Sequence, residues 1–119
     1  MAKVLIVDDS RTSRKILRTI LEGAGHEVVG EAVDGSDGFI KYKQLNPDIA
    51  TLDITMPVMD GLESLKAIKE HDKDAKIIMV TAAGQQSKMV EAIKNGASEF
   101  VTKPFEADEI IKLIDKLSK

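Results

Sequence analysis

The sequence predicts one α/β domain over residues 1–119, with a doubly wound, five-stranded parallel sheet and five helices on both of its faces. Three observations predict this fold. Short apolar runs alternate five times with segments whose apolar residues recur at helical spacing. The runs are nearly continuous, as in strands that are buried on both faces. Consecutive parallel strands need crossover connections, which the intervening helices provide.

The first βα unit consists of a predicted strand over residues 3–7 and a predicted helix over residues 12–24. Ser10 is a suitable N-cap for this helix, and Gly25 suits the left-handed position that ends it. The apolar positions of the helix fall on one face: Ile16, Leu17, Ile20, Leu21 and Ala24. We therefore expect this face to pack on the sheet.

The second unit has a predicted strand over residues 27–32, a turn and cap over 34–36, and a helix over 37–45 that an Asn-Pro pair ends. Residues 48–52 are the predicted central strand. A loop over residues 54–60 follows. The chain then alternates as helix, strand, helix, strand and helix, over residues 61–70, 76–80, 86–94, 98–101 and 107–117.

Composition excludes several classes of function. The 17 basic and 20 acidic residues give a net charge of −3, so nothing favours binding to nucleic acid. The absence of cysteine excludes disulfides and thiolate metal sites. No signal-peptide pattern and no apolar stretch of bilayer length occur, so we expect a cytoplasmic protein without a membrane partner. His26, in a turn, and His71, near a helix end, are expected to be structurally neutral.

Polar side chains follow four of the predicted strands. Asp8 and Asp9 follow the first strand, Asp53 the third, Thr81 the fourth and Lys103 the fifth. The carboxyl ends of parallel strands meet at one edge of a sheet, which is where ligands bind in open α/β sheets. We therefore expect these residues to form one site.

This arrangement predicts a magnesium-dependent phosphoryl acceptor. Two carboxylates about 5 Å apart repel by roughly 3 kcal/mol at an effective dielectric constant of about 20, so a divalent cation is expected. Magnesium suits a site with few carboxylates, and the main-chain carbonyl of Thr55 adds a ligand. Lys103, the Thr81 hydroxyl and backbone N–H groups of the neighbouring small-residue loop form a pocket for a tetrahedral dianion. Asp53 lies centrally and is the natural acceptor.

Each residue also has an ordinary structural explanation. The Asp8-Asp9 pair alone is more often a helix N-cap, and an aspartate at position 53 is as often a turn former. Thr81 alone is a loop hydroxyl, and Lys103 an exposed lysine. The functional interpretation depends on four polar residues that follow four strands at the same edge.

The motifs at these positions resemble the bacterial response-regulator receiver domain, over essentially the whole chain. They are Val7-Asp8-Asp9-Ser10, Leu52-Asp53-Ile54-Thr55-Met56-Pro57, Met59-Asp60-Gly61, Val80-Thr81-Ala82 and Thr102-Lys103-Pro104-Phe105. The resemblance implies a flavodoxin-like fold with strand order 2-1-3-4-5.

The resemblance also implies a role for each site residue. Asp53 is the implied phosphoacceptor, which holds Mg²⁺ together with Asp8, Asp9 and the Thr55 carbonyl; Mn²⁺ is an expected substitute. The implied roles of the remaining residues concern the switch. Thr81 reorients towards the phosphoryl group, Lys103 pairs with it, Phe100 turns inward, and the Lys103-Pro104 bond is cis.

By the same resemblance, a sensor histidine kinase supplies the phosphoryl group from a phosphohistidine. The protein then loses it by slow self-dephosphorylation and is not a dedicated enzyme. Gly84-Gln85-Gln86 with Asn95-Gly96-Ala97 resembles the chemotaxis type of single-domain receiver. Its partner is the flagellar switch, reached through the face of the fourth helix, fifth strand and fifth helix. We expect a monomer with no output domain.

Three alternatives remain open at this point. A phosphorelay intermediate, which passes the group to a histidine phosphotransfer protein, has the same site residues. An aspartyl-phosphate phosphatase of the haloacid dehalogenase type needs a D-x-D motif where this chain has Asp8-Asp9-Ser10, and usually a cap domain. A flavodoxin-like cofactor binder needs aromatic rings around the flavin, but the chain has no Trp and one Tyr.

Overall fold

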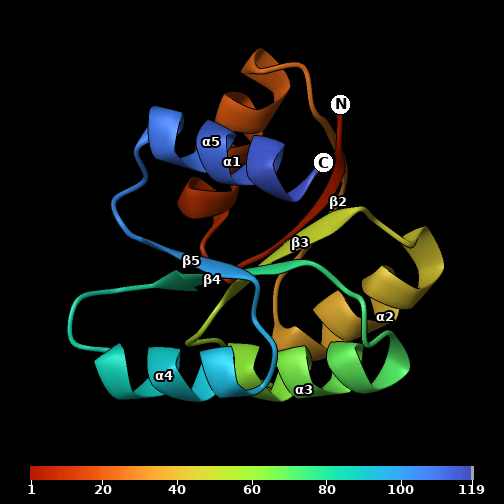
Figure 1. The fold of residues 1–119 in the computed structure, drawn as a ribbon, viewed down its shortest axis with the longest axis vertical. Coiled ribbons are helices and arrows are strands. Elements are labelled where there is room, and N and C mark those ends of the chain that lie inside the picture. Colours follow the sequence, from red (N-terminus) through yellow and green to blue (C-terminus); the bar gives the residue numbers. More distant parts are fainter. Residues whose placement is uncertain (119) are drawn as a thin grey trace.

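The computed structural model describes residues 1–118, and within them the predicted parallel sheet is present with strand order β2-β1-β3-β4-β5 (Figure 1). The predicted fold class is therefore confirmed. The strands are β1 (Lys3–Val7), β2 (Glu27–Ala32), β3 (Ile49–Asp53), β4 (Ile77–Thr81) and β5 (Glu99–Thr102).

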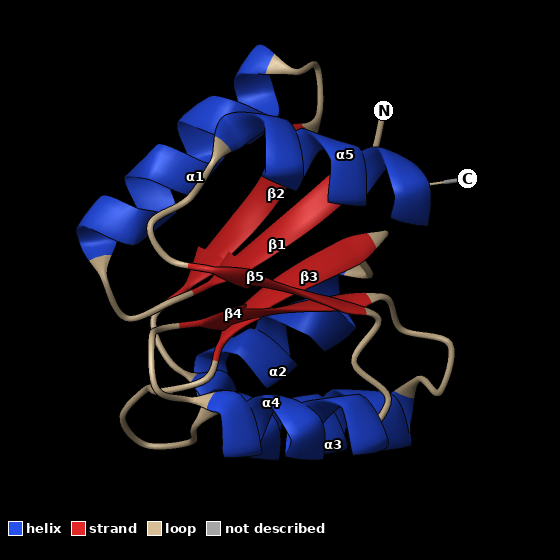
Figure 2. Ribbon diagram, turned by 60° about the vertical axis from the view of Figure 1, so that its left-hand side comes forward, coloured by secondary structure: helices blue, strands red, loops and turns tan. Residues whose placement is uncertain are grey.

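A helix follows each strand, and the helices form one layer on each face of the sheet. They are α1 (Arg11–Gly23), α2 (Gly35–Leu45), α3 (Gly61–His71), α4 (Gln86–Lys94) and α5 (Ala107–Leu117). Figure 2 shows α1 and α5 on one face and α2, α3 and α4 on the other. None of the helices in residues 1–118 combines the length and the apolar character that a bilayer crossing requires.

One hydrophobic core lies on each face of the sheet, because successive strand residues point to opposite faces. In β1, Leu5 and Val7 belong to the core under α2, α3 and α4, whereas Val4 and Ile6 belong to the core under α1 and α5. All four side chains are at most 1% exposed. This double burial explains why the strands read as continuous apolar runs.

Several predicted boundaries were wrong by one or two residues. Strands β3, β4 and β5 each begin and end one residue later than predicted, because polar residues at their carboxyl ends still pair with the neighbouring strand. Asp53 pairs with Val80, and Thr81 with Thr102. Helix α2 begins at Gly35 and not at residue 37, because the Asp34 side chain caps it by accepting from the Asp37 N–H. Helix α3 ends one residue later than predicted.

Helix α1 covers residues 11–23 and not 12–24, and its buried face is narrower than predicted. Ser10 is its N-cap, and Gly25 has the left-handed φ of +86°, so both of these predictions are confirmed. Leu17 and Leu21 are buried, but Ile16 is 46% exposed. Ala24 is exposed as well, because the helix contacts the sheet through a stripe centred on the two leucines.

The neutral role predicted for His26 was wrong. The residue is only 8% exposed, and its Nδ1 accepts the Ala2 N–H at 3.0 Å. The proton of the neutral ring then lies on Nε2, which is 3.2 Å from a carboxylate oxygen of Asp115 in α5. His26 therefore links Ala2, the residue before β1, to helix α5.

Replacing His26 with alanine is expected to lower the free energy of unfolding by about 1–3 kcal/mol, because the buried Ala2 N–H loses its partner. Urea denaturation of wild type and His26→Ala measures this effect. His71→Ala is the matched control: its ring is exposed, so a change within about 0.5 kcal/mol is expected. Equal stability of the two variants would contradict the structural role of His26.

Candidate functional site

The carboxyl ends of four strands bring the predicted site residues to one edge of the sheet. Asp8 follows β1, and Asp53 is the last residue of β3, which lies beside β1. Thr81 ends β4, and Lys103 follows β5. The strand order reverses between β1 and β3, where loops diverge in open α/β sheets and leave a crevice for ligands.

Three carboxylates form a compact cluster in this crevice. One oxygen from each of Asp8, Asp9 and Asp53 lies within 4.8 Å of the other two. Asp8 and Asp53 are 3% and 8% exposed, whereas Asp9 is exposed to solvent. The Asp8 side chain is held in place, because its Oδ1 accepts the Ser10 N–H at 2.9 Å.

Lys103 joins the two buried acids. Its Nζ lies 3.0 Å from Asp8 Oδ2 and 3.3 Å from Asp53 Oδ2. The Lys103 N–H donates to the Thr81 carbonyl at 2.8 Å, which attaches this residue to the end of β4. The predicted cis bond between Lys103 and Pro104 is confirmed. The lysine thus supplies part of the positive charge that the acids need.

Burial and charge shift the protonation of the cluster. Burial, followed by the charge of Asp8, raises the pKa of Asp53 from 3.8 to about 6, although Lys103 opposes the shift. Burial by itself lowers the pKa of Lys103, but its hydrogen bond to Asp8 and the charge of Asp53 raise that pKa above its usual value. One lysine therefore does not fully compensate the buried acids, and a divalent cation fits the remaining negative charge.

The donor set fits a hard cation, because each of the three clustered side chains offers an oxygen atom. Assignment of magnesium to this cluster remains a prediction, as does the Thr55 carbonyl as a ligand. The Thr55 side chain is engaged elsewhere: its Oγ1 accepts a hydrogen bond from Gln85 Nε2 at 2.7 Å.

The two predicted switch residues point away from the acids. The Thr81 hydroxyl is buried and lies 3.3 Å from the Val101 carbonyl and 3.4 Å from the Thr102 hydroxyl, both in β5. Phe100 is 41% exposed on the same strand. Their roles as a switch stay a prediction: in this arrangement Thr81 is bound to β5, and Phe100 lies outside the core.

Sequence reasoning missed two residues that support the site. Arg14 donates from Nη1 to the Asp8 carbonyl at 2.8 Å while its Nε pairs with Glu31. Gln85 joins the loops after β3 and β4: its Nε2 donates to the Thr55 hydroxyl, and its Oε1 accepts the Ala82 N–H. Arg14 could have been found from the sequence, because it is a basic residue near the start of α1, close to the two aspartates. Nothing in the sequence distinguished Gln85 from Gln86 as a residue of the site.

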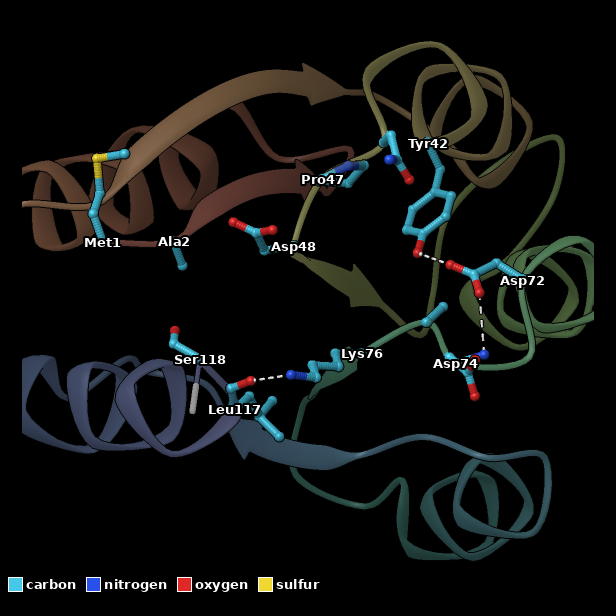
Figure 3. A pocket seen from close by; sticks show the side chains of 12 residues that line it. Met1, Ala2, Tyr42, Pro47, Asp48, Asp72, Asp74, Lys76, Leu117 and Ser118 are labelled. Atoms are coloured by element: carbon cyan, nitrogen blue, oxygen red, sulfur yellow. Dashed lines mark hydrogen bonds between the residues drawn. The ribbon is translucent and has the colours of Figure 1, made fainter.

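A cavity of about 490 Å³ opens at the opposite edge of the sheet, and none of the site residues lines it (Figure 3). Its polar groups are used to hold the turns around it. The Tyr42 hydroxyl donates to Asp72 at 2.9 Å, and Lys76 Nζ donates to the Leu117 carbonyl at 2.6 Å. Asp48 accepts the Lys3 N–H at 2.8 Å. The acidic cluster, and not this cavity, is therefore the candidate functional site.

Comparison with known proteins identifies the class of this fold and site. Residues 4–115 match the response regulator receiver domain, and the chain belongs to this family. Within the family it is CheY-like. It is 48% identical over 117 residues to the chemotaxis protein CheY of Thermotoga maritima, with 98% of each chain covered. It is also 48% identical over 114 residues to CheY of Bacillus subtilis, covering 96% of this chain and 95% of the relative.

A solved structure gives the same relationship. The CheX-CheY-BeF3-Mg complex of Borrelia burgdorferi contains a chain that aligns with a TM-score of 0.92 at 39% identity, covering 98% of this chain and 89% of that one. The family membership favours a receiver over the phosphatase and flavin-binding alternatives.

The raised pKa of Asp53 predicts how stability depends on pH without magnesium. The folded state binds a proton on Asp53 more tightly than the unfolded state does, so stability falls as pH rises between about 4 and about 6. At pH 8 without magnesium, Asp53→Asn is expected to be more stable than wild type by about 2–3 kcal/mol. Urea denaturation of wild type and Asp53→Asn at pH 4 and at pH 8 measures the difference in stability, which should nearly vanish at pH 4. Parallel profiles would contradict the shift.

Proposed function

We propose that this receiver accepts one phosphoryl group on Asp53, with magnesium held by Asp8, Asp9, Asp53 and the Thr55 carbonyl. The observation that carries the proposal is the cluster itself: three carboxylates within 4.8 Å of one another at the sheet edge, with Lys103 beside two of them. The exposed Asp9 leaves the crevice open to a donor.

In the proposed reaction, an Asp53 oxygen attacks the phosphorus of a phosphohistidine on a sensor histidine kinase. A P–O bond forms, the P–N bond breaks, and the histidine leaves. A bound magnesium ion supplies positive charge that stabilises the transferring group. Lys103 adds a second positive charge in the same crevice. Water later attacks the phosphorus, which releases phosphate and restores the Asp53 carboxylate, so the protein is a slowly self-dephosphorylating switch and not a dedicated enzyme.

The proposed response is a shift between two populations. Phosphoryl charge on Asp53 attracts the Thr81 hydroxyl away from β5, and Phe100 fills the space that Thr81 leaves. Phe100 pairs with Met79, which belongs to the core under α2, α3 and α4. Val90 and Ile93 of α4 are each 53% exposed, so α4 offers apolar side chains to a partner. The proposed partner face is the one that the resemblance implies, made of α4, β5 and α5.

The relatives named chemotaxis protein CheY support a role in chemotaxis. The flagellar switch as the partner, and the cytoplasm as the location, belong to the proposal. The relay hypothesis differs from it only in the partner. Binding of the beryllofluoride-treated protein to flagellar switch proteins and to histidine phosphotransfer proteins separates the two. Binding to the phosphotransfer protein alone would favour the relay.

The chemistry is tested by intact mass after incubation with acetyl phosphate, with and without magnesium. One added phosphoryl group that requires magnesium is the expected result. Because fast hydrolysis would hide an adduct, beryllofluoride binding in magnesium is measured in parallel. The absence of both an adduct and beryllofluoride binding would overturn the proposal.

A further inference from the structure

The Gln85 side chain connects the two loops that follow the central strands. Its Nε2 donates to the Thr55 hydroxyl at 2.7 Å, in the loop after β3. Its Oε1 accepts the Ala82 N–H at 2.7 Å, in the loop after β4. Thr55 lies two residues beyond Asp53, so this bridge spans the edge of the sheet where Asp53 emerges. Gln85 is also the N-cap residue of α4, but its side chain makes no cap hydrogen bond.

The direction of the Ala82 N–H gives the bridge its significance. The Thr81 carbonyl accepts the Lys103 N–H and therefore points towards β5. The Ala82 N–H belongs to the same trans peptide and points the opposite way, towards the side of β3, the strand that ends in Asp53. The carbonyl of Ile54, the residue that follows β3, already accepts the Gly61 N–H at 2.8 Å. Among residues 1–118, the Gln85 oxygen is the acceptor that takes this N–H.

A backbone N–H that faces the strand carrying the acceptor carboxylate is a donor of the kind that a phosphoryl oxygen requires. While Gln85 holds it, the donor is not available to a group on Asp53. The bond to Thr55 keeps the carboxamide in place, because displacing Gln85 from Ala82 also disturbs this second hydrogen bond.

We propose that Gln85 is a positioning residue that competes with the phosphoryl group for the Ala82 N–H and thereby favours the unphosphorylated state. The inference rests on the proposed phosphorylation of Asp53. Phosphorylation releases the Gln85 side chain from both loops, and because this residue is the N-cap of α4, its release reaches the first turn of that helix. Gln85 thus sets the affinity of the site for a phosphoryl group and contributes to its coupling with α4.

The test is a titration with beryllofluoride in saturating magnesium. Gln85→Ala is expected to bind about three- to tenfold more tightly than wild type, because two hydrogen bonds no longer oppose binding. Gln86→Ala is the matched control: it is the same substitution one residue later, on an exposed side chain, and should bind like wild type. Thr55→Val keeps the backbone carbonyl and removes the hydroxyl, so it should shift affinity in the same direction.

A second readout follows the Ala82 amide resonance by NMR. Beryllofluoride should move this resonance in wild type, and Gln85→Ala should change it before any ligand is added. A merely structural role would lower the stability of Gln85→Ala without tightening binding. Wild-type affinity in both folded Gln85→Ala and Thr55→Val would overturn the inference and leave the proposed function intact. If wild type itself binds no beryllofluoride and takes no phosphoryl group, both fail together.

Discussion

Asparagine at position 53 is expected to abolish phosphorylation completely while the fold is retained. The amide has nearly the size of the carboxylate but lacks its nucleophilic negative charge, so no acyl phosphate forms. Burial of the side chain does not oppose the change, because an amide avoids the cost of burying a charge. Intact mass after incubation with acetyl phosphate and magnesium should show one added phosphoryl group in wild type and none in Asp53→Asn.

Asp48→Asn is the matched control for this experiment. Asp48 lies immediately before the same strand, at the opposite edge of the sheet, and the asparagine retains an oxygen that accepts the Lys3 N–H. This variant should be phosphorylated like wild type. Full labelling of Asp53→Asn would refute Asp53 as the acceptor, and loss of labelling in both variants would show that the substitutions act through the fold.

The second large effect is expected from Gly61→Ala, which should lower the free energy of unfolding by about 3 kcal/mol or more. A Cβ on Gly61 would overlap the Asp53 carbonyl oxygen and lie 2.8 Å from both the Asp53 carbonyl carbon and the Ile54 Cα. These are backbone atoms at and just after the end of the central strand, so they cannot move aside as a flexible side chain does. The hydrogen bond from the Gly61 N–H to the Ile54 carbonyl would be strained as well.

Gly23→Ala provides the comparison for this variant. Gly23 ends helix α1, and a Cβ there meets no atom within 4 Å. Alanine at this helical position is expected to stabilise the protein by about 0.5–1 kcal/mol. Urea denaturation of both variants measures the contrast. A Gly61→Ala protein within 1 kcal/mol of wild type would show that the chain relaxes around the new methyl group.

Most of the fold could be predicted from the sequence because the physical signals are local and repeated. Strands buried on both faces need uninterrupted apolar residues, and the crossover helices need one apolar stripe each. The order of the strands required the resemblance to receiver domains. Boundaries were less predictable: Asp53 and Thr81 look like turn residues, but each still pairs with a neighbouring strand.

Part of the candidate site was equally predictable. Because parallel strands end at one edge of a sheet, the sequence predicted that Asp8, Asp9, Asp53 and Lys103 lie close together. In the structure, the three carboxylates lie within 4.8 Å of one another. The rule does not say which donor faces which acceptor. That Lys103 contacts both Asp8 and Asp53, and that the Thr81 hydroxyl points to β5, depends on side-chain directions.

The sequence by itself determined the fold class, the edge that carries the acids and the residue types available there, because these follow from hydrophobic period and strand direction. Only the tertiary structure decided how equivalent residues differ. Gln85 bridges the loops after β3 and β4 while Gln86 is exposed, and His26 is buried against Asp115 while His71 is exposed. A methyl group fits at Gly23 but not at Gly61. The reason is that such differences arise from contacts between segments distant in the chain, which no local pattern records.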